Sequence, residues 1–354
     1  MKLSSRNRLL AAAVAAAAVP GLVLASSAIA QAEPTSPIGP RQLAGMGSDT
    51  TQDVLNALSD AIVINGVKPI ASYNSQGGAV TTKSPLPAGA TNCTYAANNA
   101  GAPNAGAGIR ANGSGAGRSR LVEASTSGNP YVGCLDFARS SSETLAAVTP
   151  GLTYIPFGLD GVSYAVRADS TNSRQLSLAA LRSIYQCAAP TRAAFSPLLP
   201  QSGSGTRTFF LATIGVTEPE IAAGGCVQST VTRNGVSTSV QENDGTVLTD
   251  AKQIVPYSAA QYSSQQAQVT PDIRGTAVLG AIGGVPAQSV NAGSAGTRRV
   301  FNVVPTSKVG AADAAVLNQV FVGSGSQVCQ QTGVIARYGF GLIADCGSTT
   351  RTTG

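Results

Sequence analysis

Four short turns rich in Gly, Ser and Thr limit this chain to a small set of architectures. They lie at residues 45–51, 113–117, 138–142 and 203–207. Each turn follows an apolar segment with the character of a strand and precedes a segment with helical spacing. The stripe of Val54, Leu55, Leu58 and Ile62 and the segment from Glu143 to Val148 are two such helices. This repeated order of strand, turn and helix predicts an α/β fold.

The same four turns predict a site for a small oxyanion. The start of a helix has unsatisfied backbone N–H groups and a partial positive charge, so it can hold an anion without a lysine. Glycines allow close approach of the backbone, and Ser and Thr hydroxyls add donors. A single such turn is more often only a structural cap. Four of them at strand-to-helix junctions of an open α/β sheet are expected to converge on one crevice.

The residue types that are missing argue against catalysis. The chain has no histidine, which excludes nucleophile systems with an imidazole base and the His-rich zinc hydrolases. No lysine has a Ser three residues before it, and no Walker-type loop is present. The 17 acidic residues leave carboxylate chemistry open, but their spacing selects no pair. We therefore expect a protein that binds a ligand, with no enzymatic activity, no cofactor and no metal.

The amino-terminal segment predicts export. Three cations precede an apolar stretch over 9–25, and small residues with the pattern read by signal peptidase follow. A membrane anchor is the alternative, but the stretch is short and rich in Ala, and Glu33 and Pro34 follow it. We expect residues 1–32 to be a cleaved signal peptide. Since no Cys follows the apolar stretch, no lipid anchor is expected, and the mature protein should be secreted, either extracellular or associated with the cell wall.

The charge of the mature chain argues against large anionic partners. Without the leader, 20 basic residues face 17 acidic ones, a net charge of +3, and charged residues make up only 11% of the full sequence. This is too weak to predict binding to nucleic acid or to an anionic membrane.

Six cysteines in an exported chain indicate three disulfides. Sequence alone allows fifteen connectivities. We expect each cysteine to pair with its nearest neighbour, because each bridge then closes a loop within one segment. Zinc binding is the alternative, which the spacing and the lack of His disfavour. The expected pairs are Cys93 with Cys134, Cys187 with Cys226, and Cys329 with Cys346.

In this order, the four turns resemble the binding loops of the phosphate-binding proteins of ABC-type uptake systems. The loops concerned are Gly45 to Thr50, Gly113 to Gly117, Asp136 to Ser141 and Gly203 to Thr206. The resemblance covers essentially the whole mature chain. It implies the two-lobed type II periplasmic-binding-protein fold, with a cleft between the lobes and two hinge crossings, at 155–166 and 254–262. Lobe one would comprise 43–156 and 258–346, and lobe two 157–257.

The resemblance also implies the ligand, the partners and the site. Phosphate is the first candidate for the oxyanion, a membrane ABC permease is a possible partner, and the protein would be a monomer. The residues expected to bind the ligand are Ser48, Asp49, Thr50, Ser114, Gly115, Arg139, Ser140, Ser141, Ser204, Gly205, Thr206 and Arg207.

Three positions depart from the family pattern. Ser141 stands where the family has an Asp that accepts a proton from phosphate, and Pro200 stands where it has an Arg. Asp49 replaces a ligand-contacting Thr and would repel a dianion unless it pairs with Arg139 or Arg207. Sulfate, a phosphorylated ligand and a sugar-like ligand therefore stay open beside phosphate.

Two other functions also stay open. The first is a surface or matrix protein that keeps the scaffold but has lost or changed the ligand site. The second is a phosphate-ester hydrolase that works through carboxylates and a metal.

Overall fold

The computed structural model describes residues 33, 39–98, 106–233, 235–286 and 296–353. The expected signal peptide, 1–32, lies outside the described residues. Within the described ranges, no helix is long and apolar enough to cross a membrane.

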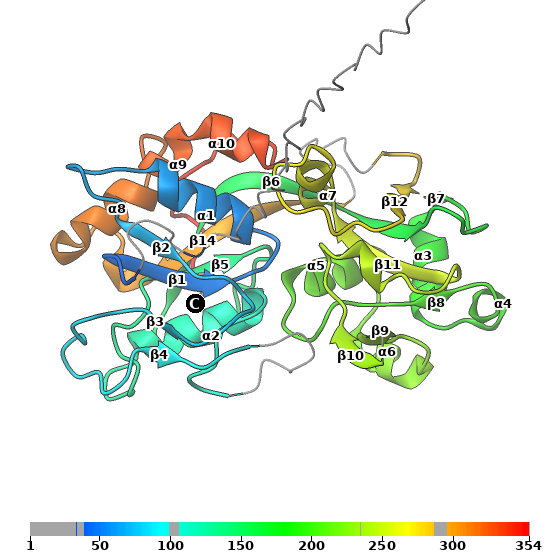
Figure 1. The fold of residues 1–354 in the computed structure, drawn as a ribbon, viewed down its shortest axis with the longest axis horizontal. Helices are drawn as coiled ribbons and strands as arrows, with labels where there is room; N and C mark the ends of the chain where they lie inside the picture. The colour runs from blue at the N-terminus through cyan, green and yellow to red at the C-terminus, as the bar shows by residue number, and fades with distance from the viewer. Residues whose placement is uncertain (1–32, 34–38, 99–105, 234, 287–295, 354) are drawn as a thin grey trace, which may run out of the picture. The chain divides into compact units, whose positions relative to one another are not determined.

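One eight-stranded sheet organises the chain (Figure 1). Its strands follow the order β2-β1-β5-β14-β6-β11-β8, and β12 pairs with β6 off this path. Strands β1, β2 and β5 are parallel, whereas β14 runs antiparallel to both β5 and β6. The strands are β1 Leu43–Gly47, β2 Ile70–Ser72, β5 Phe137–Ser140, β6 Leu152–Arg167, β8 Ser196–Pro197, β11 Gln253–Ser258, β12 Ala277–Leu279 and β14 Thr297–Pro305.

Three two-stranded sheets complete the strand pairing among the described residues. They pair β3 Val80–Thr81 with β4 Thr94–Tyr95, β7 Gln175–Leu176 with β13 Ala281–Ile282, and β9 Thr230–Arg233 with β10 Val236–Ser239.

Helices follow the strands as the sequence pattern predicts, with one exception. The helices are α1 Gln52–Ala61, α2 Ser114–Ser125, α3 Leu178–Tyr185, α4 Ala189–Arg192, α5 Gly205–Ile214, α6 Glu218–Gly224, α7 Ala259–Gln266, α8 Ala315–Phe321, α9 Gln327–Gln330 and α10 Thr332–Arg337, with 3₁₀ turns at Gly245–Val247, Thr306–Lys308 and Ala312–Ala314. The exception is the helix expected at 143–148, where the described chain has no regular secondary structure before β6 begins. The Ser140 hydroxyl donates to the Ser142 carbonyl at 2.6 Å, and Pro150 follows closely, and both disfavour a helix there.

The core is divided into two packing regions that share β6. The first region contains β1, β2, β5 and α1 and includes Phe157 of β6 and Phe301 of β14. The second region contains α3, α5 and β11 and includes Val162 and Val166 of β6. Figure 1 shows β6 as one long strand that belongs to both groups of elements.

The second packing region extends beyond the boundary expected at 258. Ala277 and Ile282 pack in it, because β12 pairs with the carboxyl-terminal half of β6. Val300 and Phe301 of β14 are back in the first region. Ala260 of α7 also packs in the first region, so the chain passes between the two regions more than once after residue 258, and the lobe bounds stay a prediction.

The three disulfides have the expected nearest-neighbour pairing. The bridges are Cys93–Cys134, Cys187–Cys226 and Cys329–Cys346, with Cα–Cα distances of 5.3, 5.9 and 5.8 Å. The predicted connectivity is confirmed.

Candidate functional site

The four predicted turns come together in a buried group of hydroxyls. We call this group the hydroxyl cluster; it consists of Ser48, Thr50, Ser114, Ser141, Ser204 and Thr206. Ser141 links two of the turns, because its Oγ accepts from Ser48 Oγ at 3.0 Å and lies 3.3 Å from Ser114 Oγ. Thr50 Oγ1 lies 3.5 Å from Thr206 Oγ1 and joins the first turn to the fourth. The expected convergence is thus present.

The sheet and the helix starts explain this convergence. Strands β1 and β5 are parallel neighbours, so the turns that follow them lie at the same edge of the sheet. Helices α2 and α5 begin at Ser114 and Gly205. A Cβ on Gly205 would lie 2.5 Å from Ser141 Oγ and 3.0 Å from the Ser142 nitrogen, so only glycine allows the turns to meet.

A carboxylate of the protein itself lies among these hydroxyls. Glu242 is completely buried. One of its oxygens accepts from Thr50 Oγ1 at 2.7 Å and from Thr206 Oγ1 at 2.8 Å, and the other accepts from Ser204 Oγ at 3.1 Å. The hydroxyl cluster therefore already coordinates an oxyanion. Sequence reasoning missed Glu242, because an isolated acid in a polar loop carries no motif.

A buried ion pair adjoins the cluster. Arg298 Nη2 donates to Thr206 Oγ1 at 2.7 Å and to Asp160 Oδ2 at 2.8 Å. Arg298 on β14 and Asp160 on β6 are direct cross-strand partners, which explains their alignment. Burial raises the pKa of Asp160, and the charge of Arg298 opposes this shift. The only signal in the sequence was a charge within an otherwise apolar strand, and sequence reasoning missed both residues.

Asp49 makes the site more acidic than expected. It is buried, and its Oδ2 has no hydrogen-bond partner among the described residues. Burial, and then the negative charge of Glu242, raise the pKa of Asp49 well above its ordinary value of 3.8. Both causes favour the neutral, protonated form of Asp49.

Several backbone amides of the turns have partners within the protein. Ser48 N donates to the Arg139 carbonyl and Gly115 N to the Gly203 carbonyl. Ser141 N donates to Ser114 Oγ, and the amides of Thr206 and Arg207 donate to Ser204 Oγ, the N-cap of α5. In this conformation the donors that meet the Glu242 carboxylate are hydroxyls, whereas the sequence had indicated backbone amides as well.

The side chains of three predicted residues, Arg139, Ser140 and Arg207, contact none of the hydroxyls of the cluster. Arg139 is fully buried and holds the backbone of the first turn, through donation to the Ser48 carbonyl at 3.0 Å and the Tyr73 carbonyl at 2.6 Å. Burial lowers its pKa to about 9. Arg207 pairs with Glu218 at 2.5 Å, and the Ser140 hydroxyl donates to its own turn. Neither cation compensates Asp49 by direct pairing; the cation at the cluster is Arg298.

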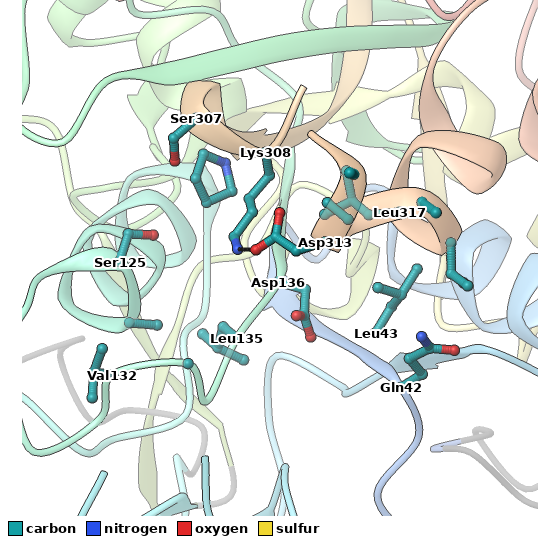
Figure 2. Close-up of a pocket in the computed structure, with 17 residues that line it drawn as sticks. Gln42, Leu43, Ser125, Val132, Leu135, Asp136, Ser307, Lys308, Asp313 and Leu317 are labelled. Atoms are coloured by element: carbon teal, nitrogen blue, oxygen red, sulfur yellow. Dashed lines mark hydrogen bonds and ion pairs between the residues drawn. The ribbon is translucent and has the colours of Figure 1, made fainter. Parts of the chain in front are cut away.

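A large cavity lies elsewhere, at the opposite ends of the same strands. It has a volume of about 490 Å³ and is lined by Leu43 and Asp136, which stand at the starts of β1 and β5. Figure 2 shows that Leu317 and the Lys308–Asp313 ion pair also line it. Ligands of open α/β sheets bind at the carboxyl ends of strands, so the hydroxyl cluster is the better candidate site.

No protein-family model matches the sequence, and no curated protein matches it. A putative phosphate ABC transporter substrate-binding protein with bound phosphate, from Clostridium perfringens, is similar in structure over 85% of this chain and 99% of its own. The TM-score is 0.52 and the identity 13%. An ABC-type phosphate transport receptor from Vibrio cholerae is similar over 85% of this chain and 100% of its own, with a TM-score of 0.48 and 13% identity. The first likeness shows the fold and confirms the predicted two-lobed α/β architecture.

Proposed function

We propose that this chain is an exported solute-binding protein that holds a small oxyanion, phosphate first, between its two lobes. The Glu242 carboxylate carries the proposal, because hydroxyls from two turns already surround it as they would surround a bound anion. The ligand would take the place of this carboxylate when the lobes open and close again. Delivery to a membrane permease, action as a monomer and removal of residues 1–32 belong to the same proposal.

The charges at the cluster suit an exchange of one anion for another. Arg298 and Asp160 pair with each other, so the carboxyl group that the hydroxyls contact is that of Glu242. A monoanion that replaced Glu242 would leave the net charge unchanged. A phosphate dianion would add one charge, and a protonated Asp49 would accommodate it by donating a hydrogen bond.

The test is a thermal-shift and calorimetry panel of phosphate, sulfate, arsenate and sugar phosphates. An oxyanion at about 100 times its Kd should stabilise the fold by about 2.7 kcal/mol. Thr206→Val should abolish this gain, because Thr206 Oγ1 contacts both Glu242 and Arg298. Thr213→Val is the matched control, since Thr213 lies on the same helix and donates to the Phe209 carbonyl away from the cluster. A ligand-induced shift that survives in Thr206→Val would refute this site.

The alternative is a surface or matrix protein that keeps the scaffold without the ligand. The close packing of the turns favours it, because a Cβ on Gly205 would already lie 2.3 Å from Ser114 Oγ and 2.5 Å from Ser141 Oγ, so the closed cluster leaves little space for a dianion. It predicts that none of the four ligand types shifts the melting temperature and that Ser114→Ala leaves this result unchanged.

A further inference from the structure

A second cavity opens beside the hydroxyl cluster and is lined by three arginines. Its volume is about 250 Å³, and Arg298, Arg299 and Arg351 line it together with the hydroxyl residues Ser142 and Thr208. It is contiguous with the cluster through Arg298, which also contacts Thr206. The proposed function makes no use of Arg299, Arg351 or this cavity.

The charges around this cavity favour an anion. Arg299 pairs with Asp345 at 2.9 Å and Arg351 with Glu143 at 2.8 Å. Arg298 pairs with Asp160 at 2.8 Å. Each arginine thus has one carboxylate partner, but of the three acids only Glu143 lines the cavity, so guanidinium groups outnumber carboxylates on its wall. Arg298 is only 5% exposed, and its Nη1 atom is buried with no hydrogen-bond partner among the described residues. Planar guanidinium groups match the oxygens of phosphate and sulfate.

The remaining wall of the cavity is apolar. Phe209, Ala212 and Phe301 line it. The Phe209 ring lies under the Arg298 guanidinium, 5.7 Å from ring centroid to Cζ. An inorganic anion would leave this wall uncovered, whereas a ligand with a small carbon skeleton would bury it. Pockets for small organic molecules combine such apolar walls with a few placed polar groups.

We infer that this cavity is a second binding site, which takes a phosphate or sulfate monoester with a small apolar skeleton. The phosphate or sulfate group of this ligand lies between Arg299 and Arg351, and its apolar skeleton lies against Phe209 and Phe301. Both arginines are partly exposed and lie outside the hydroxyl cluster, so this site does not depend on the proposed function.

Titration calorimetry with phenyl phosphate, phenyl sulfate and inorganic phosphate tests the inference. The wild type should bind both phenyl esters. The double variant Arg299→Gln, Arg351→Gln should bind them at least about tenfold more weakly, because each lost charged hydrogen bond is worth about that factor or more. Arg337→Gln, an exposed arginine on α10, is the control and should bind as the wild type does.

Two more variants separate this site from the hydroxyl cluster. Phe209→Leu should weaken phenyl phosphate but not inorganic phosphate, and Thr206→Val should retain phenyl ester binding. If the wild type binds no phenyl ester, or if the double variant binds as the wild type does, the second site is refuted. Either outcome would leave the phosphate response of the cluster intact, so the two proposals fail separately.

Discussion

At the scale of single residues, the site is defined by hydroxyls around a carboxylate. Thr50 and Thr206 each donate to the same oxygen of Glu242, at 2.7 and 2.8 Å. Hydrogen bonds to a charged group are worth about 1.5–3 kcal/mol each. A ligand must therefore replace these bonds with its own, and Glu242 acts as its competitor.

Replacement of Glu242 by Gln should strengthen oxyanion binding. The amide keeps the size of the side chain but removes the negative charge that an incoming anion must displace. We expect the Kd for phosphate to fall about tenfold or more, measured by calorimetry at constant pH. Glu123→Gln is the control: Glu123 lies on α2, pairs with Arg120 away from the cluster, and its replacement should leave the affinity unchanged. Equal or weaker binding by Glu242→Gln would mean that the carboxylate is part of the ligand's own coordination.

Replacement of Asp49 by Asn should change how stability depends on pH. The folded protein raises the pKa of Asp49, so it holds this proton more tightly than the unfolded chain does. Above about pH 4, unfolding then releases a proton, and stability falls as pH rises toward the raised pKa. Asn stays neutral at every pH, so the variant does not lose stability in this way as the pH rises. The melting temperature of Asp49→Asn minus that of the wild type should grow from pH 4 to pH 8, and a difference that stays constant with pH would contradict the assignment.

At the scale of elements, caps and bridges fix the helices around the site. Ser204 accepts from the amides of Thr206 and Arg207 and so caps α5. The Cys187–Cys226 bridge follows both α3 and α6 and ties their carboxyl ends together. The Ser204 cap and the bridge between the neighbouring helices together hold α5 with its amino terminus at the cluster.

Removal of the Cys187–Cys226 bridge should destabilise the second region. Its 39-residue separation corresponds to a loop-closure contribution of about 4 kcal/mol, against about 3 kcal/mol for the 17-residue separation of Cys329–Cys346. Urea denaturation of the two double Cys→Ala variants measures both losses. The reverse order of losses would show that loop length does not govern them.

At the scale of the whole molecule, the site contacts hold the two packing regions together. Thr50 belongs to the first region and Glu242 to the segment before β11, and Gln261 of α7 donates to the Thr50 carbonyl at 2.6 Å. Opening of the lobes must break these bonds, while β6 remains continuous between the regions.

Replacement of Gly205 by Ala should keep the lobes from closing. The new Cβ would lie 2.5 Å from Ser141 Oγ and 3.0 Å from the Ser142 backbone nitrogen, and a backbone atom cannot move aside easily. We expect a larger radius of gyration in small-angle scattering with an unchanged circular dichroism spectrum. Gly333→Ala, where a Cβ would meet nothing within 4 Å, is the control. An unchanged radius of gyration would show that the turns can adjust while the lobes stay closed.

Local patterns in the sequence were sufficient for the architecture and for half of the site. Apolar spacing, Gly-rich turns and the cysteine spacing predicted the α/β elements and the three bridges. They also predicted the convergence of six hydroxyls, because neighbouring residues decide where strands end and helices begin; these are Ser48, Thr50, Ser114, Ser141, Ser204 and Thr206. The helix expected at 143–148 was wrong, because side-chain bonds in the turn and a following Pro compete with it.

Only the tertiary structure decided what faces the hydroxyls. Glu242 meets Thr50 across 192 positions, and Arg298 meets Asp160 across 138. The contacts of Arg139 and Arg207 also depend on the tertiary structure. Arg139 donates to backbone carbonyls and Arg207 pairs with an acid, and these partners come close only in the folded chain. Burial and charge depend on which distant segments pack together, and no local spacing encodes that.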